Sequence, residues 1–218
     1  MLRALLICST CCFASPVLAC ETAILLAIDV SGSIAPDEYL LQMNGLAEAL
    51  QDPDIVGALV RGQDNLAVVQ WSGDRFQQLS LPWQHLTTTA QVAALAEILR
   101  QQQRPPDYTD TAIGNAVRFS TAQFADVPDC PRHVIDVSGD GEENDGMTLP
   151  EARAEAEAAG IIINGVAIEI GDDTTKLTDY YRANVISQDG FVMTAKGLRD
   201  YPRAIAAKLL RELTKPVS

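Results

Sequence analysis

Three oxygen-bearing side chains at alternate positions, Asp29, Ser31 and Ser33, follow an apolar run near the start of the chain. A carboxylate and two hydroxyls suit a hard cation better than a nucleophile, because they supply only oxygen ligands. Gly32 lets the loop fold tightly around an ion. The alternative is helix capping, since Ser31 or Ser33 stands shortly before a good helix start at Pro36. Further ligands elsewhere in the chain would decide between the two interpretations.

Two later loops carry more oxygen side chains. The polar loop 107–111 contains Thr109 and Thr111 and leads into an expected helix. Asp140 lies in the glycine-rich acidic loop 138–146, which follows an expected strand. In an open α/β sheet, ligands bind at the carboxyl ends of the strands. The chain therefore offers the additional ligands that a cation site requires.

The elements that position these loops alternate between strands and helices. The first apolar run shows no polar alternation, which is typical of a buried parallel strand. Helical spacing of apolar residues and proline breaks indicate the helices. We expect strands at 24–30, 65–71, 76–81, 130–137, 161–168 and 191–193, helices at 36–50, 88–102, 112–124, 150–159, 177–184 and 198–213, and a short helical turn at 54–60.

This order predicts a three-layer α/β fold with a Rossmann-like open sheet, mostly parallel, and helices on both faces. The turn at 72–74 is too short for a crossover, so the strands beside it form a hairpin and one edge strand runs antiparallel. Trp71 and Trp83 are expected to fill the core around this hairpin. With 218 residues, of which 47% are hydrophobic, the chain is large enough for one core, and we expect a single domain over 20–218.

Residues 1–19 have the features of a secretory signal peptide: a basic start, a short apolar core and small residues at the end. The segment is too short to anchor the chain, and no later segment could span a membrane in its place. We therefore expect a secreted protein, periplasmic or extracellular. The 29 acidic and 16 basic residues give a net charge of −13, which argues against nucleic acid and anionic membranes as partners.

Two of the five cysteines, Cys20 and Cys130, remain once the signal peptide is removed. An even pair in an exported protein suggests a disulfide. Cys20 lies nine residues before Asp29 and Cys130 lies ten before Asp140. Parallel strands with level ends would therefore bring the two cysteines together. The alternative is a lipid anchor on Cys20, because the segment 17–20 resembles a lipoprotein processing site.

Three ordered segments, D-V-S-G-S at 29–33, T-D-T-A-I-G at 109–114 and V-S-G-D-G-E at 137–142, resemble the metal-ion-dependent adhesion site of von Willebrand factor A domains. The resemblance covers nearly the whole chain after the signal peptide, because the order of elements also matches. It extends to small exported bacterial proteins of unassigned role that consist of little more than this domain. The fold expected from it is the same open α/β sheet.

The resemblance implies five metal-binding residues, Asp29, Ser31, Ser33, Thr109 and Asp140. The two serine hydroxyls would bind the ion directly, and Thr109 would bind it directly or through water. The two carboxylates would hold coordinated water or bind the ion themselves.

The threonine ligand is assigned by its distance from the next helix. Thr109, rather than Thr111, matches the metal-binding threonine of the family, since it stands five residues before Gly114. The family usually has Gly-Gly before this threonine, and this chain has Asp107-Tyr108.

The resemblance also implies a kind of ion and a kind of partner. Hydroxyl ligands leave the cation under-neutralised and attractive to an incoming carboxylate. Partners of such domains commonly supply an Asp or Glu as the last ligand. Oxygen ligands favour Mg²⁺ or Mn²⁺, with Ca²⁺ as an alternative, and nothing in the chain suggests zinc. The function expected is protein–protein interaction or adhesion, and not catalysis.

The strongest enzyme alternative is a phosphatase similar to the haloacid dehalogenases, with Asp29 as nucleophile. That family has a second aspartate where this chain has Ser31, and a lysine before the late acidic motif, which all four lysines here follow. A serine hydrolase fails because no nucleophile elbow surrounds Ser31. In a structural domain that has lost its metal function, we expect some of the ligand positions to be replaced by residues without oxygen ligands. All five positions here keep such a ligand.

Two further features of the chain are open to interpretation. Glu142, Glu143 and Asp145 could form a second ion site, but a solvated acidic loop is the preferred interpretation. Asp136 lies inside an apolar strand, where a buried carboxylate needs partners. We expect these partners to be structural hydrogen bonds to a neighbouring loop and not a metal.

Overall fold

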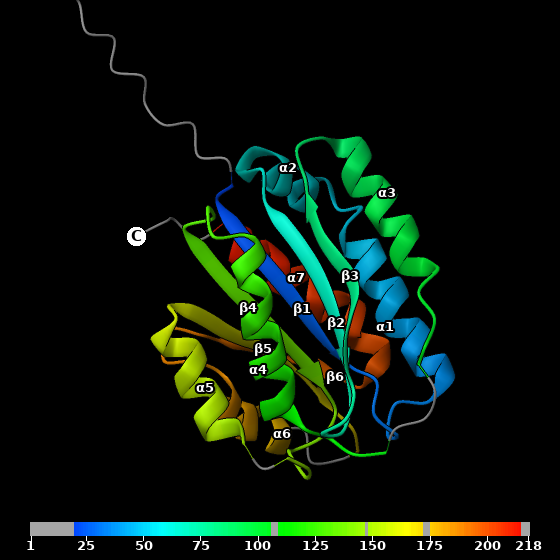
Figure 1. Ribbon diagram of the computed structural model, residues 1–218. Coiled ribbons are helices and arrows are strands. Elements are labelled where there is room, and N and C mark those ends of the chain that lie inside the picture. The colour runs from blue at the N-terminus through cyan, green and yellow to red at the C-terminus, as the bar shows by residue number, and fades with distance from the viewer. Residues whose placement is uncertain (1–19, 106–108, 147, 172–174, 215–218) are drawn as a thin grey trace, which may run out of the picture.

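The computed structural model describes residues 20–105, 109–146, 148–171 and 175–214. The expected signal peptide, 1–19, lies outside these residues. Six strands form one sheet in the order β3-β2-β1-β4-β5-β6 (Figure 1). All neighbouring strands are parallel except β2 and β3. The predicted sheet, mostly parallel with one antiparallel edge strand, is confirmed.

The bounds of the elements follow the expected order. The strands are β1 (Thr22–Asp29), β2 (Asn65–Trp71), β3 (Gln77–His85), β4 (Arg132–Gly139), β5 (Ile161–Glu169) and β6 (Val192–Lys196). The helices are α1 (Pro36–Ala49), α2 (Pro53–Gly62), α3 (Thr89–Arg100), α4 (Ile113–Gln123), α5 (Leu149–Ala158), α6 (Lys176–Tyr180) and α7 (Tyr201–Leu213). None of the described helices is long and apolar enough to cross a membrane.

The helices form a layer on each face of the sheet, as predicted (Figure 1). Helices α1, α2, α3 and α7 pack together on one face, and α4, α5 and α6 lie on the other. Side chains of β1 alternate between the two cores: Leu26 and Ile28 belong to the first, Leu25 and Ala27 to the second. Because both faces are covered, the whole of β1 is buried and its sequence shows no polar alternation.

Two segments differ from their predicted lengths for local reasons. The expected turn at 54–60 is the ten-residue helix α2. Asp52 caps it by accepting hydrogen bonds from the backbone of Asp54 and Ile55, and Pro53 occupies its first position, where no N–H is needed. The edge strand β3 runs on to His85, which pairs with Asn65 at the start of β2.

The predicted disulfide is present between Cys20 and Cys130. Its position follows from the pairing of β1 with β4, in which Thr22 lies beside Arg132 and Ile28 beside Ser138. This register matches the 110-residue separation of the two cysteines. A lipid anchor would need the same Cys20 sulfur, which in this structure is bonded to Cys130.

The partner of Asp136 is a helix and not the neighbouring loop that we expected. Lys208 of α7 is fully buried and its Nζ forms an ion pair with Asp136 of β4 and, at 2.8 Å, with Glu212 Oε1. Asn164 of β5 also donates a hydrogen bond to Glu212 Oε1. The sequence pattern missed this because the cluster joins residues far apart in the chain. The cluster ties α7 to the middle of the sheet.

We expect Lys208→Met to lower the free energy of unfolding by about 3–5 kcal/mol, because the substitution leaves two buried carboxylates without their cation. Urea denaturation at neutral pH measures the change. The control is Lys196→Met at an exposed position, for which a change within about 0.5 kcal/mol is expected. Equal stability of the two variants would contradict the structural role of the cluster.

A second buried carboxylate, Asp64, stands at the amino end of the sheet. Its Oδ1 accepts a hydrogen bond of 2.8 Å from the backbone of Thr22. Burial raises the pKa of this carboxyl from 3.8 to about 7, and the hydrogen bond from Thr22 opposes the shift only in part. The native state therefore holds a proton here at pH values where the unfolded chain has lost it.

A raised carboxyl pKa stabilises the native state at low pH, and this contribution is lost as the pH rises through about 7. We expect Asp64→Asn to lack this loss, because a neutral amide has no proton to release. At pH 8 the variant should be more stable than the parent by about 2–4 kcal/mol, since one pKa unit corresponds to about 1.4 kcal/mol. Urea denaturation from pH 4 to pH 8 measures the difference, with the exposed Asp189→Asn as control. A constant difference across this range would refute the assignment.

Candidate metal centre

The strand order places two of the predicted ligands side by side. The chain leaves β1 toward β2 on one side, and β4 lies on the other side of β1. This is the point where an open sheet leaves a crevice at the carboxyl ends of its strands. Asp29 is the last residue of β1, and Asp140 directly follows β4.

Four of the five predicted residues are linked one to the next by hydrogen bonds: Asp29, Ser31, Ser33 and Asp140. Asp29 Oδ1 accepts from the backbone of Ser31 at 2.8 Å, and the Ser31 and Ser33 hydroxyls lie 3.2 Å apart. The Ser33 hydroxyl donates to Asp140 Oδ1 at 2.6 Å. Ser31 is buried and Ser33 is exposed, so the set leads from the sheet to the surface.

The loop that carries the serines is not a helix cap. The N-cap of α1 is Ala35, whose backbone N–H donates to Glu38 Oε2 at 2.9 Å. Both serines therefore lie before the cap and keep their hydroxyls for the site. The capping alternative is thus wrong.

Long polar side chains hold the backbone of the same loop. Gln42 of α1 donates to the Asp29 carbonyl at 3.3 Å. Arg104 donates to the carbonyls of Val30 and Ser31 at 3.4 Å and 3.2 Å. Arg104 lies on the connection that leads to Thr109, so it links two of the ligand-bearing loops. Neither Gln42 nor Arg104 is expected at the site from the sequence, because long polar residues outside a motif carry no local signal.

The electrostatics of the centre favour a cation. Burial, and after it the charge of the neighbouring Asp140, raise the pKa of Asp29 from 3.8 to about 7, although hydrogen bonds from Ser31 and from the backbone of Asp140 lower it in part. Burial also raises the pKa of Asp140, against the hydrogen bond from Ser33. Within the described part of the chain, no Lys or Arg forms an ion pair with either carboxylate. Two carboxylates and two hydroxyls in contact fit a hard divalent cation, which would neutralise the charge of the two carboxylates.

Thr109 is not joined to the other four residues. Its hydroxyl donates to Asp110 Oδ2 at 3.0 Å, at the exposed end of a connection whose preceding residues, 106–108, lie outside the described structure. The unusual Asp107-Tyr108 pair falls in that gap. Thr111 is buried, and its backbone N–H donates to Asn144 at 2.9 Å. Neither threonine makes a hydrogen bond to the metal centre among the described residues.

Two acidic side chains of the loop after Asp140 bind backbone groups of neighbouring elements. The prediction of a solvated acidic loop is therefore only partly correct. Glu143 accepts hydrogen bonds from Gly114 at 2.9 Å and from Leu149 at 3.3 Å, at the starts of α4 and α5. Asp145 accepts from the backbone of Asp74 at 2.7 Å. No group of three or more His, Cys, Asp or Glu suited to a second metal is present among the described residues. The acidic side chains thus fix the loop that carries Asp140.

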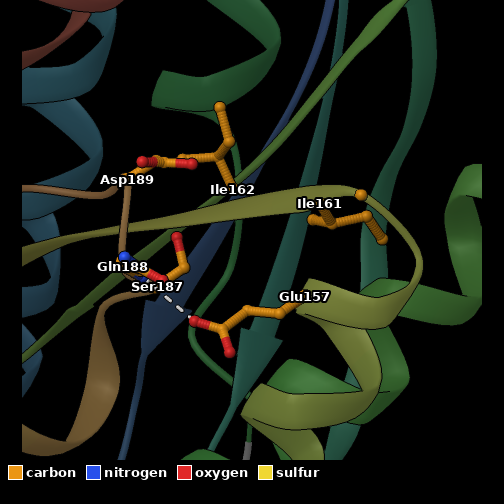
Figure 2. A pocket seen from close by; sticks show the side chains of 7 residues that line it. Glu157, Ile161, Ile162, Ser187, Gln188 and Asp189 are labelled. Carbon is orange, nitrogen blue, oxygen red and sulfur yellow. Dashed lines mark hydrogen bonds between the residues drawn. The ribbon is translucent and has the colours of Figure 1, made fainter.

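A hollow of about 280 Å³ lies away from this centre (Figure 2). It lies where β5 begins, whereas the metal centre lies where β1 and β4 end. Glu157 Oε1 accepts from the backbone of Gln188 at 3.0 Å across its floor. Its lining residues are Glu157, Gly160, Ile161, Ile162, Ser187, Gln188 and Asp189. None of the predicted site residues lines it.

The sheet, its helix layers and the ligand-bearing edge define a von Willebrand factor A-like fold. Proximal thread matrix protein 1 from the mussel byssus, in a structure with a zinc-occupied metal-ion-dependent adhesion site, has a TM-score of 0.66 at 19% identity, over 89% of this chain and 48% of that chain. A von Willebrand factor type A structure from Catenulispora acidiphila has a TM-score of 0.66 at 15% identity, over 91% and 44%. The pilus adhesin SpaC from Lactobacillus rhamnosus GG, in its open conformation, has a TM-score of 0.63 at 14% identity, over 89% and 30%.

These likenesses establish the fold, and the chain spans about half or less of each of the three proteins. Among curated proteins, no sequence matches significantly. The chain belongs to the family described as "Protein of unknown function (DUF1194)", which matches residues 19–217.

At pH 8 we expect the oxidised protein to bind one Mg²⁺ or Mn²⁺ per chain. Ser31→Ala removes a hydroxyl and Asp140→Ala removes a carboxylate from the centre, and each should weaken binding by about 10–100-fold. Isothermal titration calorimetry measures the affinity, with the remote Asp189→Asn as control. A folded parent that binds no divalent ion, or variants that bind as the parent does, would refute the metal centre.

Proposed function

We propose that this protein is a secreted module that holds a divalent cation through Asp29, Ser31, Ser33, Thr109 and Asp140 and uses it to bind an acidic group of a protein partner. The observation that carries the proposal is the hydrogen bond between Ser33 and Asp140. It joins the loops after β1 and β4 at the surface, with the buried Asp29 behind them.

The residues of the centre lie at different depths below the surface. Asp29 is buried and supplies negative charge from below, while the exposed Ser33 and half-buried Asp140 present oxygens toward solvent. Neutral hydroxyls lower the positive charge of an ion less than carboxylates do. A bound ion would therefore keep an affinity for one more carboxylate, supplied by the partner.

The ion is proposed from the ligand chemistry. Oxygen ligands favour Mg²⁺ or Mn²⁺, with Ca²⁺ as an alternative. The mussel structure carries zinc at the corresponding kind of site, so the titration should include Zn²⁺ as well. The measured affinities then show which of these ions the centre binds at the concentrations at which each is available.

We propose binding and not catalysis. Ser31 occupies the position where a haloacid-dehalogenase-like phosphatase has its second aspartate, and its hydroxyl lies beside Ser33. A serine cannot act there as a general acid. The likeness to a pilus adhesin supports adhesion or protein interaction as the role.

Secretion is supported by two features. The chain begins with the signal-like segment 1–19, and the disulfide between Cys20 and Cys130 is typical of oxidising compartments. We propose the periplasm or the extracellular space as its location.

The test of partner binding uses immobilised protein and exported proteins of the native host. We expect a partner that is retained in Mg²⁺ or Mn²⁺, released by EDTA, and not retained by Asp140→Ala. In that partner, one Asp→Asn or Glu→Gln substitution should abolish retention, because it removes the last ligand. Retention that persists in EDTA and with Asp140→Ala would instead support a metal-independent scaffold.

A further inference from the structure

Tyr181 approaches the metal centre along the face of the sheet that α4, α5 and α6 cover, over a groove on β4 and β5. It is fully buried at the point where α6 continues into a π-helical turn, and its carbonyl accepts a hydrogen bond of 3.0 Å from Ile186. π-Helical turns occur frequently at functional sites. The groove exists because β4 and β5 each have a glycine there, Gly139 and Gly165. A Cβ on Gly165 would lie 2.8 Å from Tyr181 Cδ1, and a Cβ on Gly139 would lie 2.7 Å from the Tyr181 hydroxyl.

The position that a Cβ on Gly139 would occupy is also close to the Asp29 carboxylate. A Cβ there would lie 2.8 Å from Asp29 Oδ2. The Tyr181 hydroxyl and Asp29 Oδ2 are both buried, and neither has a hydrogen-bond partner among the described residues. Buried polar atoms without partners are rare and costly. Here a phenol donor and a carboxylate acceptor face one another across a glycine.

We infer that Tyr181 is a positioning residue for the metal centre, and that its hydroxyl donates a hydrogen bond to Asp29 Oδ2, directly after a small rotation or through one water molecule. Asp29 Oδ1 is already held by the backbone of Ser31. A donor at Oδ2 fixes the second oxygen and so the plane of the carboxylate. Its effect on cation affinity rests on the proposed function, whereas the hydrogen bond itself does not.

The link also joins a distant segment to the centre. Tyr181 belongs to the connection between β5 and β6, which carries none of the five predicted ligands. Its neighbour Tyr180 points to a different contact, since its hydroxyl accepts from the backbone of Glu143 at 3.1 Å. Tyr180→Phe therefore removes a phenol from the same segment without touching Asp29, and it is the matched control for the spectrum of Tyr181.

The first measurement is made in EDTA, so that it does not depend on a metal. The Raman spectrum of the parent minus that of Tyr181→Phe isolates the Fermi doublet of Tyr181, whose intensity ratio reports whether the phenol donates a hydrogen bond. We expect the ratio of a donor, and a change toward a weaker donor in Asp29→Asn. Tyr180→Phe should leave the Tyr181 signal unchanged. A non-donating Tyr181, or a ratio that Asp29→Asn does not alter, would overturn the inference.

The second measurement is the affinity for Mg²⁺ and Mn²⁺. Tyr181→Phe should fold normally and bind about fivefold to tenfold more weakly than the parent, the effect of one lost hydrogen bond, while the remote and exposed Asp189→Asn stays within about twofold. Equal affinities of Tyr181→Phe and the parent would overturn the positioning role. If the parent itself binds no ion, the proposed function fails, and the spectrum in EDTA still decides whether the hydrogen bond exists.

Discussion

The parallel pairing of β1 with β4 is the constraint on which the rest of the structure depends. Its register places Thr22 beside Arg132 and Ile28 beside Ser138. Cys20 and Cys130 share this offset and meet at the amino end, where the disulfide closes. At the carboxyl end the same register brings the Asp29 and Asp140 loops within hydrogen-bonding distance. A shift of one residue would misalign the cysteines and the ligand loops together, and it would turn every β1 side chain to the opposite core.

The cost of burying a carboxylate is offset in a different way at each of three aspartates. Asp136 is compensated by Lys208, an ion pair that also anchors α7. Asp64 has a backbone N–H and a raised pKa, so it tends to hold its proton. Asp29 has one N–H and, in our inference, one phenol, and its charge adds to that of Asp140. The first two arrangements serve the stability or the pH dependence of the fold. The third places two carboxylates with raised pKa values next to one another at the carboxyl ends of β1 and β4, where a divalent cation could replace their protons.

The fold could be predicted from the sequence nearly completely, because its signals are local or periodic. Uninterrupted apolar runs identify strands covered on both faces, and a short turn identifies the antiparallel edge. Errors were confined to lengths, as at α2, where capping by Asp52 extends a predicted turn to ten residues. Four of the five candidate ligands were also brought together as expected, since each stands at a fixed distance from the end of β1 or β4. Thr109 belongs to a connection with no such strand, and its position was not constrained in the same way.

By itself, the sequence determined which residue types stand at the strand ends, the alternation of elements, and the even pair of cysteines. Only the tertiary structure decided which distant groups face these residues: Lys208 with Asp136, Glu143 with the starts of α4 and α5, and Tyr181 with Asp29. The physical reason is that local signals arise from backbone preference and from the period of burial, which act over a few residues. Contacts between buried polar groups depend on how layers pack. The groove that holds Tyr181 arises from glycines on two neighbouring strands, β4 and β5, whose pairing the chain order does not reveal.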